Sequence, residues 1–201
     1  MTFCLTLVGC VSLQAVSPAN MKAYELSLAV DKDRAAVAWH GGVTGADAIF
    51  LQALDSAGRA AGSPHQITDG QRYAYEPDLQ FVEGDPLLAW YEKDVANGSL
   101  TAWLARTDTQ GRVVWKRQLD AVHGSARNPV VRVSNDVICV AWIEKHQAIE
   151  VFAERFDADG NVVMAAKRVG MASDTTWKSQ RRRRCEGPVL RYLRCACGYE
   201  G

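Results

Sequence analysis

The sequence predicts an all-β fold, a partial β-propeller of three four-stranded antiparallel blades of about 50 residues each. The main observation is an Ala-Trp pair that closes a short apolar run at Trp39, Trp90 and Trp142, at spacings of 51 and 52 residues. A second landmark, an Asp-x-x-Gly turn, follows each tryptophan at a similar distance. Two landmarks that keep the same period indicate tandem repeats of one supersecondary unit.

The Asp-x-x-Gly turns begin at Asp55, Asp108 and Asp157, and each lies between two β-rich runs. An Asp side chain can accept hydrogen bonds from the turn backbone, and Gly can take the left-handed conformation without a Cβ clash. Each turn therefore predicts a hairpin.

A third landmark opens the later repeats, where Glu76-Pro77 and Asn128-Pro129 lie 52 residues apart. Proline suits the first residue of a strand, so we expect strands to begin there. A polar turn and the tryptophan-ending run follow, which makes four strands per repeat. The repeats are predicted over residues 24–68, 76–119 and 128–169, within a repeat region of residues 21–177.

Each repeated tryptophan is expected to fill the space between adjacent blades, because aromatic side chains dominate core burial. A β-sandwich also has many short strands. Its strands have different environments, however, and no reason to repeat tryptophan, proline and Asp-x-x-Gly together.

The N-terminal residues 1–20 resemble a bacterial lipoprotein signal followed by a tether, with Leu7-Val8-Gly9-Cys10 as the lipobox. The resemblance implies lipidation of Cys10 and a lipid-anchored location at the bacterial cell envelope, on the periplasmic or outer-membrane face. The segment departs from the pattern, because no Lys or Arg precedes a short apolar run. A chance Val-Gly-Cys is the alternative.

The C-terminal residues 178–201 lack the repeat pattern and carry seven basic against two acidic residues, in a chain with 23 of each. Three interpretations compete: an arginine patch for phosphates, a solvated disordered extension, or a segment read out of frame. The third is favoured because the approach to Trp177 resembles the start of another repeat. A nucleic-acid partner is not expected.

The sequence indicates no cofactor and no metal site. Cys195-Ala196-Cys197 lacks the two-residue spacing of a zinc or redox pair, and Cys139 is expected to be a small buried side chain. The histidines form no metal-binding motif, and His40 and His146 are expected to be exposed loop residues.

The repeats resemble bacterial β-propeller proteins of the sialidase-like superfamily over about residues 24–169. The resemblance does not extend to an intact sialidase Asp-box, because the serine two residues before the Asp is missing in all three turns. No catalytic residues are assigned, since nothing in the spacing selects a carboxylate pair.

Binding residues of propellers usually lie in the loops at one end of the central channel. The connectors 69–75 and 120–127 precede the predicted innermost strands, and the alternative is that they are ordinary solvated loops. The candidate ligand-binding residues are Gln71, Arg72, Tyr73, Tyr75, His123 and Arg127.

These patterns favour a noncatalytic, envelope-associated propeller that binds a protein or carbohydrate ligand, with membrane attachment through Cys10 if that residue is lipidated. The chain is expected to be truncated, because three blades do not close a ring. The alternative function is a fragment of a propeller-fold glycoside hydrolase or lyase whose catalytic residues are partly missing.

Overall fold

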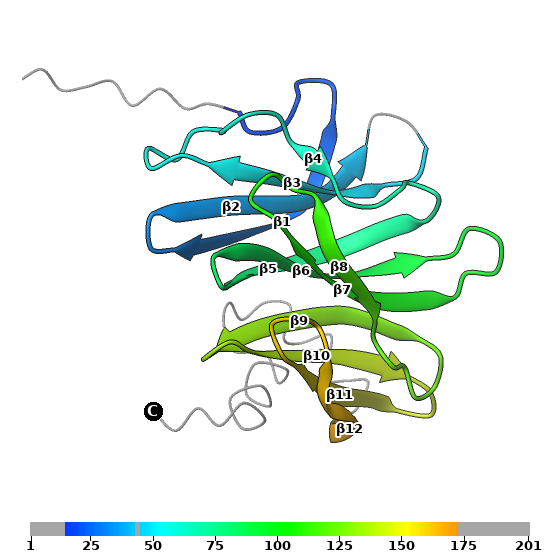
Figure 1. Cartoon of the computed structure of the whole chain (residues 1–201). Helices are drawn as coiled ribbons and strands as arrows, with labels where there is room; N and C mark the ends of the chain where they lie inside the picture. Colours follow the sequence, from blue (N-terminus) through cyan, green and yellow to red (C-terminus); the bar gives the residue numbers. More distant parts are fainter. Residues whose placement is uncertain (1–14, 43–44, 173–201) are drawn as a thin grey trace, which may run out of the picture.

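The structure, a computed structural model, describes residues 15–42 and 45–172 of the chain. These residues form three four-stranded antiparallel sheets in chain order and contain no helix (Figure 1). Blade 1 contains β1 (Lys22–Asp31), β2 (Arg34–Gly42), β3 (Ala48–Leu54) and β4 (His65–Gln66). Blade 2 contains β5 (Tyr73–Val82), β6 (Asp85–Lys93), β7 (Leu100–Thr107) and β8 (Val113–Gln118). Blade 3 contains β9 (Ala126–Ser134), β10 (Val137–Lys145), β11 (Ile149–Phe156) and β12 (Val162–Ala172). The predicted fold class, a partial β-propeller, is confirmed.

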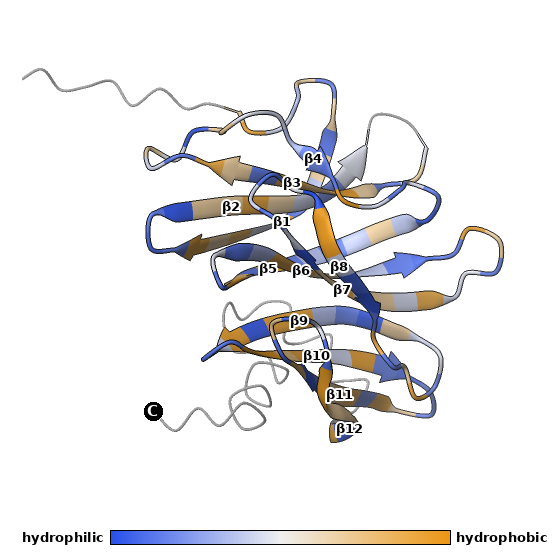
Figure 2. Ribbon diagram, in the orientation of Figure 1, coloured by the Kyte–Doolittle hydropathy of each residue, from blue (hydrophilic) through white to orange (hydrophobic). Residues whose placement is uncertain are grey.

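The three sheets stack face to face, and their first strands β1, β5 and β9 lie next to one another. Apolar residues line β2 and β10, while the turns that lead into these strands are hydrophilic (Figure 2). One apolar cluster joins blade 1 to blade 2, and a second joins blade 2 to blade 3. The core therefore lies between blades, because a single sheet cannot bury both of its faces alone.

The repeated tryptophans lie on the same face of each blade, here called the leading face. Trp90 packs against blade 1 and Trp142 packs against blade 2, so both fill the space between blades as predicted. Trp39 is equally buried, but it belongs to a separate cluster with Phe50, and its neighbours there include Met21. Among the described residues, no blade covers the leading face of blade 1.

Two of the indoles are also held by a carboxylate two residues further along the strand. The Nε1 atoms of Trp90 and Trp142 donate to Glu92 and Glu144, each at 2.9 Å. The corresponding residue of blade 1 is Gly41, where a Cβ atom would lie only 1.8 Å from a backbone oxygen of β1. A buried indole N–H thus has an acceptor in both interior interfaces, as burial of a polar group requires.

The Asp-x-x-Gly turns have the predicted geometry in all three blades. The Oδ1 atoms of Asp55, Asp108 and Asp157 each accept a hydrogen bond from the backbone N–H four residues later, at 2.8 to 2.9 Å. The glycine of each turn has a positive φ of 75° to 80°. The local turn chemistry therefore determines where β3, β7 and β11 end.

Polar side chains of the first strands connect consecutive blades. The backbone N–H of Leu79 donates to Ser27 Oγ at 3.0 Å, and that of Val131 donates to Asp78 Oδ2 at 2.8 Å. Burial raises the pKa of Asp78, while the nearby Arg132 guanidinium and the bond from Val131 act in the opposite direction. These bonds fix the height of each first strand relative to the next.

The prediction that strands begin at Pro77 and Pro129 is wrong. β5 begins at Tyr73 and β9 at Ala126, so each proline lies inside a strand, directly after a residue with positive φ. The strand pairing shifts register there, so neither proline is paired with a residue of the next strand. The N–H that proline lacks is therefore not required by the sheet. Bulges are among the few places where a strand tolerates proline.

Three other expectations concern particular residues and segments. Cys139 is a small buried side chain, as predicted. His40 is not in a loop: it lies in β2 and is 6% exposed, because the tryptophan-ending strand continues past Trp39. Cys10 and the tail 178–201 lie outside the described residues.

Candidate functional site

Each first strand carries a two-residue bulge opposite the buried tryptophan of its blade. The register skips Glu25-Leu26 in β1, Glu76-Pro77 in β5 and Asn128-Pro129 in β9. Two residues of one strand opposite a single residue of its partner, that is one extra residue, define a β-bulge. The tryptophan and proline landmarks thus belong to the same bulge: the proline is one of its two residues, and the tryptophan lies opposite it.

The first bulge residue has an uncommon backbone conformation in all three blades. Glu25, Glu76 and Asn128 have φ values of 48°, 50° and 50°. Non-glycine residues with such φ values are uncommon, and bulges beside binding sites often redirect a side chain. Because β1, β5 and β9 are neighbours, the bulges bring two glutamates and an asparagine to equivalent positions on consecutive blades.

An array of aromatic rings lies next to these bulges, in the residues that precede them and their strand partners. Tyr24 stacks on His40 at 5.5 Å between ring centroids, and the edge of His40 meets Tyr75 at 5.5 Å. Tyr75 also contacts Tyr91 at 5.4 Å and stacks with Tyr73 at 6.3 Å. The array crosses from blade 1 to blade 2 and leaves Tyr24 and Tyr73 partly exposed, at 46% and 37%. We call this set the inner-strand cluster: Tyr24, Glu25, His40, Tyr73, Tyr75, Glu76, Tyr91 and Arg127.

Strand pairing explains how these residues come together. The pair directly before each bulge is Tyr24 with His40 in blade 1, Tyr75 with Tyr91 in blade 2, and Arg127 with Ile143 in blade 3. Paired residues of antiparallel strands point to the same face. The same register position therefore contributes a ring pair in two blades and an arginine in the third.

The electrostatic environment of the cluster is dominated by carboxylates. Burial lowers the pKa of His40, although the charges of Glu25 and Asp47 act to raise it. Burial, followed by the charges of Glu76 and Glu25, raises the pKa of Tyr91 to about 12, and Arg127 opposes this. Burial and the charge of Asp47 likewise raise the pKa of Tyr75. His40 is thus favoured in its neutral form, and both phenols stay protonated at neutral pH.

Two buried nitrogens of the cluster have no hydrogen-bond acceptor or donor among the residues that the structure describes. His40 Nδ1 lies 3.5 Å from Glu25 Oε2 but makes no hydrogen bond, and Arg127 Nε is also unsatisfied. Buried polar atoms normally find a partner, so exceptions call for an explanation. Both nitrogens are suited to interact with a polar ligand.

The structure places three of the predicted binding residues in this cluster. Tyr73 and Tyr75 belong to the ring array, and Arg127 is close enough to act on Tyr91. Arg72 instead pairs with Asp94 at 3.5 Å, and the Gln71 backbone donates to Asp69 in a local turn.

His123, the remaining predicted residue, lies in blade 3. Its Nε2 atom is 2.7 Å from Glu150, and its ring stacks on His146 at 4.8 Å. Arg168 also donates to Glu150 at 2.7 Å, and together with the His123 contact it lowers the pKa of that carboxyl. His146 is exposed in the turn after β10, as expected. These partners satisfy one another and are separate from the ring array.

Sequence reasoning missed Tyr24, Glu25 and His40 and could not select Glu76 or Tyr91. A signal was present, because Glu25, Glu76 and Asn128 each precede the tryptophan of their blade by 14 residues. The spacing alone does not reveal the bulge. If the extra residue of the bulge is not known, counting along the strand assigns these side chains to the wrong position.

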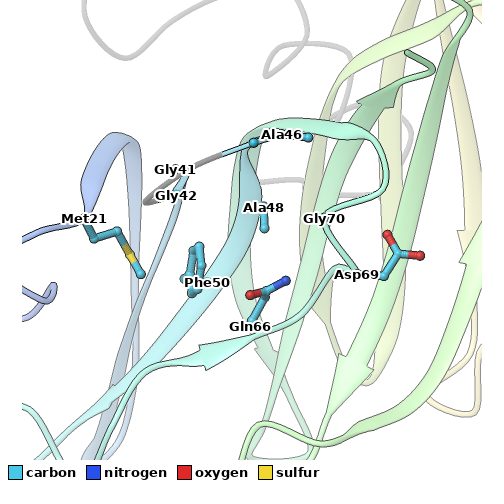
Figure 3. A pocket seen from close by; sticks show the side chains of 10 residues that line it. Met21, Gly41, Gly42, Ala46, Ala48, Phe50, Gln66, Asp69 and Gly70 are labelled. Carbon is cyan, nitrogen blue, oxygen red and sulfur yellow. The ribbon is translucent and has the colours of Figure 1, made fainter. Parts of the chain in front are cut away.

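A cavity of about 370 Å³ lies on the leading side of blade 1 (Figure 3). Met21, Phe50, Gln66 and Asp69 line it, together with small residues of the surrounding strands and turns. Gln66 Nε2 donates to Thr68, and Asp69 Oδ1 accepts from Gln71, so both polar side chains are used within the turn. The inner-strand cluster, in contrast, has two glutamates at equivalent bulges and two unsatisfied nitrogens, and it is therefore the stronger candidate site.

Within residues 15–42 and 45–172, no group of three or more His, Cys, Asp or Glu side chains is arranged to hold a metal ion. The same residues include no helix that is long and apolar enough to cross a membrane.

No family model matches the chain, and no curated protein matches it. Solved structures do. A GH43_1 enzyme from Xanthomonas citri superimposes with a TM-score of 0.54 at 15% identity, covering 77% of this chain and 57% of that one. An endo-arabinase from Bacteroides thetaiotaomicron gives 0.51 at 10% identity, covering 72% and 61%. A neuraminidase-like protein from A/little yellow-shouldered bat/Guatemala gives 0.51 at 13% identity, covering 73% and 43%.

The fold shared with these structures is the β-propeller. At these identities the likeness concerns the fold alone, and the chain spans less than two thirds of the length of each of these structures.

Proposed function

We propose that this chain is part of a propeller-fold glycoside hydrolase and that the inner-strand cluster contacts its carbohydrate ligand. The observation that carries the proposal is the equivalent position of Glu25 and Glu76, each the first bulge residue of the first strand in one of two neighbouring blades. Glycoside hydrolysis commonly uses two carboxylates that flank the scissile bond.

The aromatic rings support a saccharide ligand. Tyr24, Tyr73 and Tyr75 present both a flat apolar face and a hydroxyl group, which suits the C–H faces and hydroxyls of a sugar ring. Arg127 Nε and His40 Nδ1 supply two unsatisfied polar atoms beside them. Few, well-placed polar groups on an aromatic surface are typical of small-molecule sites.

The comparisons favour the enzyme alternative over a noncatalytic binding module, because two of the similar structures are glycoside hydrolases by name. This chain's own substrate and activity remain part of the proposal. Attachment to the bacterial envelope through Cys10 is a separate proposal from the N-terminal sequence. Incorporation of labelled palmitate should be lost in Cys10→Ser, and equal labelling of both proteins would eliminate the anchor.

To test the function, the full chain is titrated with a panel of arabino-, xylo- and gluco-oligosaccharides. Binding is measured by calorimetry and by NMR of the tyrosine rings. We expect binding by at least one saccharide and a loss of about threefold to tenfold in Tyr75→Ala, the scale of one aromatic contact. Hydrolysis of the bound saccharide should fall in Glu76→Gln.

Asp136→Asn is the matched control, because Asp136 is exposed in the turn at the opposite end of β9. The proposal would be refuted if no member of the panel binds. It would also be refuted if Tyr75→Ala and Asp136→Asn change saccharide affinity equally. Thermal unfolding of each variant distinguishes a lost contact from a lost fold.

A further inference from the structure

We infer that the ligand of the inner-strand cluster carries a positive charge and is a protonated amino sugar. This inference rests on the proposed function and goes further, because it specifies the chemistry of the saccharide. It depends on the charges that face the ring array, on the rings themselves and on the unsatisfied nitrogen of His40.

The charges at the ring array are mostly negative. Glu25 approaches His40 to 3.5 Å with a half-exposed side chain, and Glu76 occupies the equivalent bulge of blade 2. Asp47, directly before β3, acts electrostatically on both His40 and Tyr75. Among the described charged groups that shift the pKa of His40, Tyr75 or Tyr91, Arg127 is the one cation. Three carboxylates against one guanidinium attract a cation at short range.

The rings add a second source of attraction for a cation. Tyr24, Tyr73 and Tyr75 belong to the same array as His40, which Glu25 approaches, and Tyr24 and Tyr73 are partly exposed. An ammonium group held over an aromatic face is attracted by the ring quadrupole, and aromatic rings with carboxylates form typical ammonium-binding cages. A neutral sugar could stack on the rings but would gain nothing from the attraction of the carboxylates for a cation.

His40 presents an unsatisfied ring nitrogen beside Glu25. Its side chain is 7% exposed, its ring lies between Tyr24 and Tyr75, and burial favours the neutral imidazole. Nδ1 has no hydrogen-bond partner among the described residues, and it faces the same space as Glu25. A neutral imidazole nitrogen can accept one N–H of an ammonium group while Glu25 accepts another.

The same arrangement disfavours acidic sugars. A ligand carboxylate in this position would face Glu25, Glu76 and Asp47 with only Arg127 to pair with. Juxtaposed like charges discriminate strongly against a partner, since binding would also desolvate them. The order of affinity should therefore be amino sugar, then neutral sugar, then uronic acid.

The experiment compares three oligosaccharides of equal length on the full chain: a glucosamine oligomer, the N-acetylglucosamine oligomer and a glucuronic acid oligomer. Calorimetric titrations run at about pH 5.5, below the pKa of ordinary amines. We expect the glucosamine oligomer to bind at least about tenfold more tightly than its N-acetylated form, and this advantage to shrink at about 0.5 M salt. Glu25→Gln and Glu76→Gln should each reduce the advantage, whereas Asp136→Asn should preserve it.

The outcomes separate the two proposals. If the N-acetylated oligomer binds as tightly as the amine, or the uronic acid binds best, the inference of a cationic ligand is overturned while a saccharide site remains. An amine preference that survives both glutamate variants also overturns it, because the charge would then act elsewhere. If none of these saccharides nor the neutral panel binds, both proposals fail.

Discussion

Glu154 is a carboxyl group enclosed between blades 2 and 3. It lies in β11 opposite Val140, a member of the core between these blades, and is 1% exposed. Burial and the charge of Asp120 raise its pKa to about 7, and its Oε2 atom has no hydrogen-bond partner among the described residues. The folded protein therefore holds a proton here that the unfolded chain releases near its ordinary pKa of 4.5.

This residue predicts a specific pH dependence of stability. Because the folded-state pKa is raised, the stabilisation is complete below about pH 4.5 and is lost as the pH rises through about 7. Glu154→Gln should remove this part of the slope and increase the free energy of unfolding at pH 8 by up to about 2 kcal/mol. Gln52 occupies the equivalent position of blade 1, so the amide suits this environment.

Urea unfolding at pH 5 and pH 8 measures the effect in both proteins. The exposed Asp136→Asn variant is the control for removing one negative charge. An unchanged pH slope in Glu154→Gln would show that Glu154 is already ionised in the fold.

Individual residues also show where sequence reasoning about the site stopped. Tyr73 and Tyr75 were predictable, because they stand in a connector that leads into a first strand. His40 was not, since its position after Trp39 looks like a strand end until the pairing with Tyr24 is known. Gln71, Arg72 and His123 have local partners that the spacing of the repeats does not reveal.

The Asp-x-x-Gly turn is an element that serves both its hairpin and the contact between blades. In blade 3 the turn docks on Trp115 of β8, whose Nε1 donates to the Ala158 carbonyl at 3.1 Å. A Cβ atom at Gly160 would lie 2.9 Å from the Trp115 ring. The equivalent Gly58 of blade 1 has a similar positive φ but no described atom within 4 Å of such a Cβ.

Comparison of these two glycines separates two contributions to the free energy of unfolding: the left-handed turn conformation and the contact with Trp115. Both Gly58→Ala and Gly160→Ala should lose about 1 to 2 kcal/mol of unfolding free energy, because alanine disfavours the left-handed conformation. Gly160→Ala should lose about 1 to 3 kcal/mol more, because the methyl group overlaps the Trp115 ring. Chemical denaturation of both variants measures the difference, and equal losses would contradict the packing role of this turn.

At the scale of the whole molecule, the leading face of blade 1 is an apolar surface. Leu26, Leu28 and Val30 of β1 are 66%, 62% and 69% exposed, and Leu28 pairs with Val37 beside Trp39. In blades 2 and 3 the same face is covered by the preceding blade. An exposed apolar sheet face favours self-association.

Replacement of Leu26, Leu28 and Val30 with threonine should therefore lower self-association without a large change in stability, since threonine retains strand propensity. Sedimentation velocity over a range of concentrations measures the association. Val95→Thr is the control, because Val95 is 63% exposed but lies in the β6–β7 turn. Association that persists in the triple variant would show that another surface is responsible.

The sequence by itself determined the repeat, the number of blades in the described region and the role of Trp90 and Trp142 between them. These features depend on local rules: strands alternate their side chains between two faces, and Asp and Gly shape a turn through their own backbone. The fold class could therefore be read from the spacing of three landmarks.

Only the tertiary structure decided which residues form the candidate site. Glu25 and Glu76 are 51 residues apart in the sequence, yet both charges act on Tyr91, because they occupy equivalent bulges on first strands that pack side by side. Neither the extra residue of a bulge nor the neighbour across a blade interface follows from alternation along one strand. The meeting of carboxylates and rings is thus a property of stacked blades.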